Sequence, residues 1–285
     1  FNNITGAKQH VGNYAGVTVE KKEGHANFNG RDLLFIDLPG TYSLTARSLD
    51  ELVARNVIVN DNPDVIVNVL DASNLERNLY LAAQLLELEK PMVIALNMSD
   101  VAEEMGIKYD FKKMAELTGA TIVSTVGRTN IGTKELLEAT ISVAASQKAP
   151  GVTVNYGDLL EGKIAELVAA LEEAGTVTYP LRWIAIKLLE NDPDVVEKVK
   201  GFANTEAVLQ KAAAIREEIK DQVDLDIVFQ EYRHRYAVKV YNQSLTQAPK
   251  EIETRSDRYD KILTHRIWGL PDRKSTRLNS SHIQK

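Results

Sequence analysis

The stretch PMVIALNMSD, residues 91–100, decides the fold that this sequence predicts. Residues 91–96 are apolar throughout, and a short apolar run that ends in a polar turn is typical of a strand buried on both faces. Comparable runs lie at 33–36, 64–70 and 120–123. We therefore expect parallel strands whose carboxyl ends form one shared rim of a single sheet.

Helical patterns separate these runs. Ser48 and Glu51 have the spacing of a capping box, which predicts a helix that ends near residue 59. Leucine and alanine recur on one helical face between residues 75 and 86, and a further helix is predicted over about 133–146. The alternation predicts a doubly wound α/β domain over residues 1–148, with its ligand crevice at the carboxyl ends of the strands.

The pattern changes after residues 149–151, where the strand-like runs stop and helical periodicity takes over. Ile164, Leu167 and Leu171 share one face, and further helices are expected around 181–190 and 206–221. Another face carries Leu225, Val228, Phe229, Tyr232 and Tyr236. We predict an all-helical second domain over residues 149–255.

Composition excludes several classes of protein. The formal net charge is −6 with no block of like charges, which disfavours a chain that holds nucleic acid by its phosphates. The sequence has no cysteine, so disulfides and thiolate metal sites are excluded. Its apolar runs are far shorter than the roughly 20 residues that span a bilayer, so we expect this chain to be soluble. The five histidines show no ligand spacing, so no iron site is predicted among them.

The motif Asp37-Leu38-Pro39-Gly40 follows the run at 33–36. In nucleotide hydrolases an aspartate at this place holds magnesium, and the glycine amide approaches the terminal phosphate. The spacing occurs easily by chance, so its position after a strand carries the inference. The alternative is an ordinary turn that ends the strand.

Asn97 and Asp100 follow the strand at 91–96 and have the chemistry of a guanine reader. A carboxylate accepts hydrogen bonds from the ring nitrogen and the exocyclic amine of guanine, which adenine cannot offer. Other Asn/Asp pairs share the spacing, but this pair closes the strand two strands after Asp37. The amides of Ser124, Thr125 and Val126 follow the next strand and could meet the same base, although such residues also simply form turns.

Upstream, residues 11–20 include two glycines, as suits a mobile loop. Thr18 in this segment is a candidate magnesium ligand through its hydroxyl when a triphosphate is bound. The alternative is an ordinary glycine-containing loop.

These motifs together resemble the FeoB family, ferrous iron transport protein B. The resemblance rests on VGNYAGVTVEKK at 11–22, DLPGTYSL at 37–44 and NMSD at 97–100, where Met98 replaces a common lysine. It covers residues 1 to about 271 and is more specific in the first half. It implies a P-loop GTPase domain, a helical domain described as similar to a GDP-dissociation inhibitor, and then a membrane permease for Fe(II). GTP or GDP with Mg²⁺ would be its cofactors, at the cytoplasmic face of the cell membrane.

The sequence also departs from that family. The family begins with a strand and a Gly-x-x-x-x-Gly-Lys-Ser/Thr loop, and no such loop occurs here. Residues 1–6 resemble the helix that follows the loop, so we expect the first strand and the phosphate loop to be missing. The residue that binds an activating K⁺ in many members lies in that loop. We therefore expect this fragment to be inactive. Residues 256–271 resemble the start of the membrane-entry segment, and 272–285 resemble a non-native vector-derived tail.

The resemblance also implies roles for single residues. Thr18 and Asp37 would hold magnesium, Gly40 would contact the terminal phosphate, and Asn97, Met98, Asp100, Ser124, Thr125 and Val126 would form the guanine site. Thr41 stands where many GTPases place a glutamine that orients the attacking water, so intrinsic hydrolysis should be slow.

The expected partners are guanine nucleotide and the permease domain of the same polypeptide. No nucleic-acid partner is expected, and the question whether the protein forms a homo-oligomer stays open. Two alternatives stay open: a GTPase of the translation-factor class acting on ribosome or RNA, and a helical interaction module on a degenerate nucleotide fold.

Overall fold

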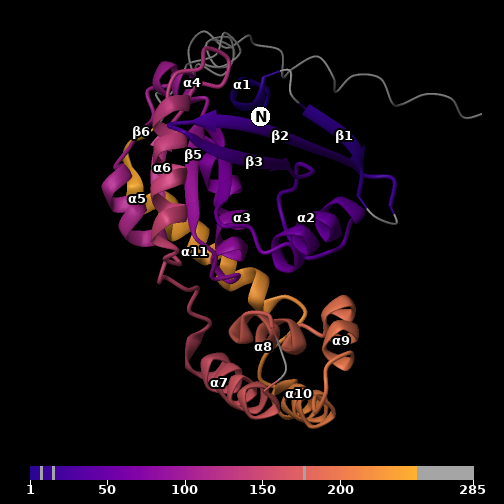
Figure 1. Ribbon diagram of the computed structural model, residues 1–285. Coiled ribbons are helices and arrows are strands. Elements are labelled where there is room, and N and C mark those ends of the chain that lie inside the picture. Colours follow the sequence, from indigo (N-terminus) through magenta and orange to yellow (C-terminus); the bar gives the residue numbers. More distant parts are fainter. Residues whose placement is uncertain (7–8, 15–16, 176–177, 249–285) are drawn as a thin grey trace, which may run out of the picture. The chain divides into compact units, whose positions relative to one another are not determined.

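The computed structural model describes residues 1–6, 9–14, 17–175 and 178–248 (Figure 1). The segments predicted at 256–271 and 272–285, and the last residues of the predicted helical domain, lie outside the described residues. Residues 1–248 form one compact unit. In the part of the chain that the structure describes, no helix is both long and apolar enough to cross a membrane.

A three-stranded parallel sheet forms the centre of the first half. Its strands are β4 (Ile66–Asp71), β5 (Met92–Asn97) and β7 (Thr121–Ser124), in the order β4-β5-β7. Leu96 in the middle strand lies opposite Leu70 on one side and Ser124 on the other. Residues 92–96 of β5 are all buried, as expected for a strand covered on both faces. The predicted strands at 64–70, 91–96 and 120–123 are therefore confirmed as strands. Burial on both faces was right for β5 but wrong for the other two, since Val69 in β4 is 58% exposed and no residue of β7 is buried.

The run at 33–36 is also a strand, but it belongs to a different sheet. β1 (Gln9–Asn13), β2 (Glu20–Phe28) and β3 (Arg31–Asp37) form an antiparallel sheet in the order β1-β2-β3. Asn29 and Gly30 both have positive φ, 52° and 77°, which suits the two-residue turn that folds β3 back onto β2. The expectation of one parallel sheet with a shared rim was wrong for β3, because this hairpin pairs it with β2.

Helices cover the parallel sheet. α3 packs on β4, and α6 packs on β5 and β7. The predicted cap of α2 is confirmed, since the hydroxyl of Ser48 accepts a hydrogen bond from Glu51 N at 3.2 Å. The helices of this half are α1 (Asn2–Thr5), α2 (Leu49–Asn60), the 3₁₀ turn η1 (Ala72–Asn74), α3 (Leu75–Leu86), α4 (Ser99–Glu104), α5 (Phe111–Thr118) and α6 (Thr133–Ser146).

The second half is mainly helical, as predicted. Ile164, Leu167 and Leu171 are buried on one face of α7. Helix α8 contacts α7, α9 and α10, and α10 also contacts α7 (Figure 1). The helices are α7 (Gly157–Ala174), α8 (Leu181–Leu189), α9 (Pro193–Lys200), α10 (Glu206–Ile219) and α11 (Val228–Ser244).

The last described elements return to the first half. α11 packs against α3 and α5, and the short strand β8 (Leu245–Gln247) pairs antiparallel with β6 (Lys108–Tyr109). The hydroxyl of Tyr236 on α11 donates to Leu117 O at 2.8 Å. The sequence did not predict β8, because three residues at a sheet edge show no periodicity.

Candidate functional site

The predicted guanine-binding residues meet at the carboxyl ends of β5 and β7. The carboxamide oxygen of Asn97 accepts from Gly127 N at 2.9 Å and from the hydroxyl of Thr125 at 3.4 Å. The hydroxyl of Ser99 donates to Thr125 O at 2.7 Å, and the hydroxyl of Ser124 donates to that of Ser99 at 2.8 Å. These contacts fix the orientation of the Asn97 side chain, because its oxygen is already occupied.

Asp100 lies in the first turn of α4 at the same edge. Met98 precedes this helix in the left-handed conformation, with φ 59° and ψ 33°, and its side chain is exposed. The Asp100 carboxylate pairs with Arg128 at 3.0 Å, and the Arg128 side chain is 79% exposed. An exposed ion pair contributes only about 0–1 kcal/mol, so a ligand could displace Arg128 at small cost.

Two of the amides assigned to the base are engaged by the chain itself. Thr125 N donates to Leu96 O at 2.8 Å, and Val126 N donates to Ile131 O at 2.9 Å. A contact from either amide to a guanine oxygen would have to share or replace these bonds. Their role in binding therefore stays a prediction.

The sequence pattern did not predict the roles of Gly127 and Arg128, which contact Asn97 and Asp100. A Cβ on Gly127 would lie 3.3 Å from the Asn97 carboxamide oxygen, which is tighter than an ordinary contact. The side chain of Asn3 in α1 also donates to Gly127 O, so the amino-terminal helix contacts this loop. A glycine directly after the strand-ending Ser-Thr-Val was the only clue in the sequence.

The predicted phosphate-side residues lie around the end of β3. Asp37 is the last residue of that strand, and its backbone oxygen accepts from the Tyr14 hydroxyl at 3.1 Å. Burial, with the nearby Asp37 carboxylate, raises the pKa of Tyr14 to about 12. Gly40 is exposed and a Cβ there would contact nothing within 4 Å, so its backbone is open to approach. The hydroxyl of Thr41 donates to Ser43 O at 2.8 Å.

The structure does not join the two groups of predicted residues. Within the described residues, no hydrogen bond or ion pair links Thr18, Asp37, Gly40 or Thr41 to the guanine-side loop. Thr18 is exposed, and residues 15 and 16 of the same segment lie outside the described residues. No group of three His, Asp or Glu side chains that could hold a metal ion occurs in the described ranges. A single carboxylate with a hydroxyl suits Mg²⁺ only when phosphate oxygens and water complete its shell.

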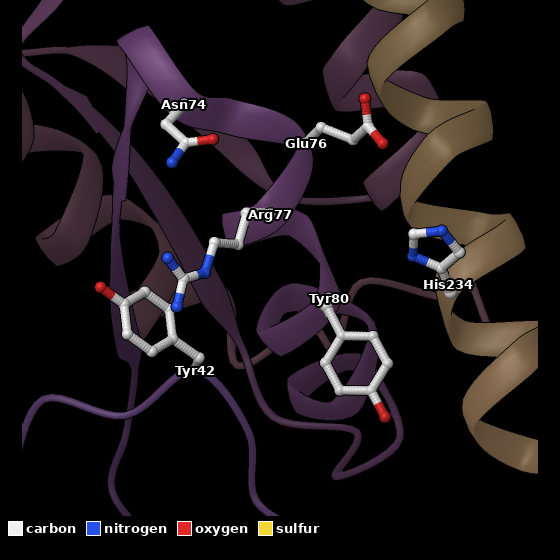
Figure 2. Close-up of a pocket in the computed structure, with 6 residues that line it drawn as sticks. All are labelled: Tyr42, Asn74, Glu76, Arg77, Tyr80 and His234. Atoms are coloured by element: carbon white, nitrogen blue, oxygen red, sulfur yellow. The ribbon is translucent and has the colours of Figure 1, made fainter. Parts of the chain in front are cut away.

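A cavity of about 510 Å³ lies beside the loop that follows Gly40 (Figure 2). The guanidinium of Arg77 stacks over the ring of Tyr42, 4.0 Å from its centroid. None of the residues assigned above to nucleotide or metal lines this cavity. Its lining residues are Tyr42, Asn74, Glu76, Arg77, Tyr80 and His234.

Known proteins match this architecture in sequence and in structure. A family model described as ferrous iron transport protein B matches residues 1–140, and one for the FeoB cytosolic helical domain matches residues 156–246. The cytosolic domain of T. maritima FeoB in its GMPPNP form is 31% identical with a TM-score of 0.74, over 86% of this chain and 93% of that one. This chain belongs to the FeoB family. The resemblance drawn from its motifs is therefore confirmed.

Other FeoB proteins extend the comparison. The cytosolic domain of L. pneumophila FeoB is 32% identical with a TM-score of 0.75, over 86% of this chain and 93% of that one. The Fe(2+) transporter FeoB of Staphylococcus aureus (strain MSSA476) is 38% identical over 275 residues, and an Fe(2+) transport protein A/Fe(2+) transporter FeoB fusion protein of Porphyromonas gingivalis is 37% identical over 280. The match takes in 95% of this chain but only 40% and 33% of those two proteins. The chain thus spans about a third to two-fifths of their length.

Proposed function

We propose that this chain is the guanine-nucleotide switch of a ferrous iron transporter, which hydrolyses GTP to regulate Fe(II) uptake through a membrane permease domain. The observation that carries the proposal is the pair formed by Asn97, at the end of β5, and Asp100, in the first turn of α4, which contact Gly127 and Arg128 in the loop after β7. The names of the relatives support the iron cargo, and FeoB structures in GDP and GMPPNP forms support the nucleotide. The proposed location is the cytoplasmic face of the membrane.

The guanine site is proposed to read the base through two side chains. The Asn97 oxygen is held by Gly127 N, which leaves its amide nitrogen to donate to a ring nitrogen of the base. The Asp100 carboxylate accepts from the ring N–H and the exocyclic amine of guanine once Arg128 moves aside. Met98, Ser124, Thr125 and Val126 would surround the base.

The phosphate side is proposed to use Asp37 and Thr18 for Mg²⁺, with Gly40 N directed at the terminal phosphate. Bound Mg²⁺ would neutralise charge between the phosphates. Thr41 has no carboxamide, and its hydroxyl is bonded within its own turn. We therefore expect slow intrinsic hydrolysis that depends on backbone groups and bound cations, K⁺ among them.

Residues 1–285 contain no Gly-x-x-x-x-Gly-Lys-Ser/Thr loop. The backbone amides and lysine of such a loop normally supply the main contacts to the phosphates. We therefore expect this chain alone to bind GDP only weakly. A chain extended at its amino terminus by a strand and a phosphate loop, called the extended chain below, should bind tightly in a fluorescent-GDP titration; tight binding by residues 1–285 alone would contradict this account.

Base specificity tests the proposal most directly. Asp100→Asn in the extended chain should lower GDP affinity by about tenfold or more, because an amide nitrogen then faces the N–H donors of guanine. The same variant should gain affinity for xanthosine diphosphate, whose carbonyl accepts from that nitrogen. Glu104→Gln, on the same helix and exposed, is the matched control. Unchanged discrimination between the two bases in Asp100→Asn would refute the guanine-reading role.

A further inference from the structure

The amino-terminal helix contacts the candidate base site through one side chain. Nδ2 of Asn3 in α1 donates to Gly127 O, 124 positions further along the chain. The N–H of the same glycine donates to the Asn97 carboxamide oxygen at 2.9 Å. Both backbone polar groups of Gly127 are therefore bonded, one to α1 and one to the side chain proposed to meet the base.

Helix α1 is itself fixed to both sheets of the first half. Thr5 is buried, and a Cβ added to Gly24 in β2 would lie 2.5 Å from the Thr5 side chain. The helix therefore approaches β2 too closely for any other residue at position 24. Ile4 packs against the hydrophobic cluster that includes the buried Val93 of β5. Asn3 thus reaches Gly127 from a helix with a defined position.

The loop that Asn3 contacts, residues 126–131, is closed by its own backbone. Val126 N donates to Ile131 O at 2.9 Å, and Thr129 N donates to Val126 O at 3.1 Å. These bonds form the turn, but they do not attach it to other elements. Residues 127–131 are exposed, so apolar packing contributes little to their position. The side-chain bond from Asn3 supplies an attachment to a distant element.

Holding Gly127 at both ends fixes the peptide groups on either side of it. Its N–H belongs to the planar unit shared with Val126, and its carbonyl belongs to the unit shared with Arg128. Only the two backbone dihedrals of Gly127 lie between these units, and glycine restricts them least of all residues. The bond from Asn3 removes this freedom. It therefore keeps the Gly127 N–H directed at Asn97.

We propose that Asn3 is a positioning residue of the guanine site, which holds Gly127 so that Gly127 holds Asn97 in the orientation that donates to the base. The inference rests on the function proposed above, in which the Asn97 amide nitrogen donates to a ring nitrogen of guanine. N7 is the ring nitrogen that accepts hydrogen bonds beside the exocyclic oxygen. Loss of the Asn3 bond should therefore weaken the contact to N7 in particular.

Hydrogen–deuterium exchange on residues 1–285 without nucleotide tests whether Asn3 holds the loop. Asn3 is exposed, so Asn3→Asp replaces the donor by a carboxylate without burying a charge. This variant should raise exchange about threefold or more over residues 126–131, with β2 and β5 unchanged. Asn3→Gln keeps a donor and should give a smaller rise. Unchanged exchange over residues 126–131 in Asn3→Asp would overturn the proposal.

Asn78→Asp is the matched control. The Asn78 carboxamide also donates to a backbone carbonyl from an exposed helical position, since it bonds to Asn74 O at 2.8 Å on α3. The same chemical change there removes an equivalent bond and should leave residues 126–131 at the wild-type exchange rate. A comparable rise over residues 126–131 in this control would overturn the assignment to Asn3.

Binding of a modified base to the extended chain tests the positioning role. 7-Deazaguanosine diphosphate lacks the N7 acceptor but keeps the N–H groups assigned to Asp100. The unmutated extended chain should prefer GDP to this analogue, and Asn3→Asp should reduce that preference at least about threefold. Asn3→Gln and Asn78→Asp should retain most of it. A merely structural role of Asn3 would weaken both ligands equally, and that result would overturn the proposal.

Two results in the unmutated extended chain separate this proposal from the proposed function. Failure to bind either nucleotide would refute the function proposed above. Equal binding of GDP and the analogue would show that Asn97 does not donate to N7, and the positioning role of Asn3 would be refuted with it. The exchange experiment decides independently of both whether Asn3 holds the loop.

Discussion

At the scale of single residues, the candidate base site depends on how one carboxamide is held. Asn97 ends a fully buried strand, and Gly127 N fixes its oxygen at 2.9 Å. The sequence predicted Asn97 and Asp100 because a polar motif directly follows an apolar run. It could not predict Gly127 or Arg128, because their role comes from the parallel alignment of β5 with β7, which brings two distant loops together.

Gly127→Val should weaken guanine-nucleotide binding in the extended chain. Even the first added carbon would lie 3.3 Å from the Asn97 oxygen, so the carboxamide must turn away. Loss of about one hydrogen bond corresponds to roughly fivefold in affinity, measurable by fluorescent-GDP titration. Gly162→Ala on α7 has open space around the new carbon and is the control. Equal affinity in the valine variant and the wild type would show that Asn97 is not held in this way.

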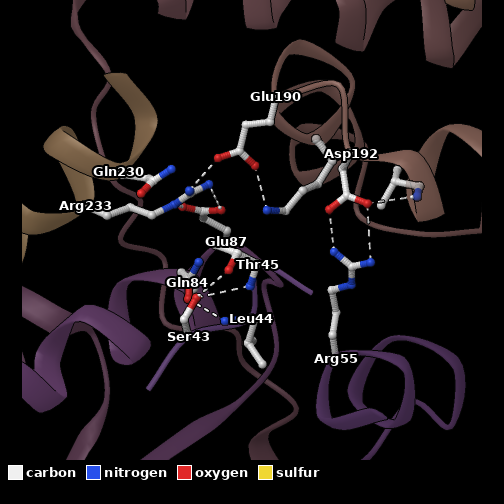
Figure 3. A network of polar contacts seen from close by, with 12 residues as sticks. Ser43, Leu44, Thr45, Arg55, Gln84, Glu87, Glu190, Asp192, Gln230 and Arg233 are labelled. Atoms are coloured by element: carbon white, nitrogen blue, oxygen red, sulfur yellow. Dashed lines mark hydrogen bonds and ion pairs between the residues drawn. The ribbon is translucent and has the colours of Figure 1, made fainter. Parts of the chain in front are cut away.

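At the scale of elements, buried charges fix how the helices meet. Arg233 on α11 is 0% exposed and donates to Glu87, after α3, at 2.7 and 3.0 Å and to Glu190, after α8, at 2.6 Å (Figure 3). Tyr156 also donates to Glu87, and burial with the Glu87 charge raises the pKa of this tyrosine well above its ordinary value. One cation therefore links three helices that lie far apart in the sequence.

Arg233→Met should destabilise the fold by roughly 3–5 kcal/mol, because it leaves Glu87 and Glu190 without their shared cation. The free energy of unfolding from urea denaturation measures the loss. Arg235→Met on the same helix removes an exposed pair with Glu231 and should cost less than about 1 kcal/mol. Similar losses in the two variants would show that the buried position of Arg233 is unimportant.

At the scale of the whole molecule, the helical half is tied to the α/β half by charge as well as by apolar packing. The main hydrophobic cluster runs from Leu44 to Val240 and includes residues of both halves. Glu190 lies in the ionic network between them. Burial opposes its ionisation, but Lys187 and Arg233 outweigh that effect and lower its pKa from 4.5 to about 2.

Stability should therefore fall in acid. A carboxyl whose pKa is lowered by folding stabilises the native state above its unfolded pKa, and this contribution is lost as the pH falls from about 4.5 towards 2. The loss is on the order of 3 kcal/mol at 1.36 kcal/mol per pKa unit. Glu190→Gln should flatten the dependence of unfolding free energy on pH in this range, whereas the exposed Glu197→Gln should not. Parallel curves for the Glu190→Gln variant and the wild type would contradict the assignment.

The sequence by itself determined the positions of the apolar strands, the capped helix at Ser48 and the polar motifs after the strands, because each depends on neighbouring residues. Only the tertiary structure decided that β3 pairs with β2, that α11 and β8 return to the first half, and that Arg55 meets Asp192 across 137 positions. Local periodicity predicts which face of an element is buried. The partner of that face is selected by contacts between distant segments, which form only when the whole chain folds.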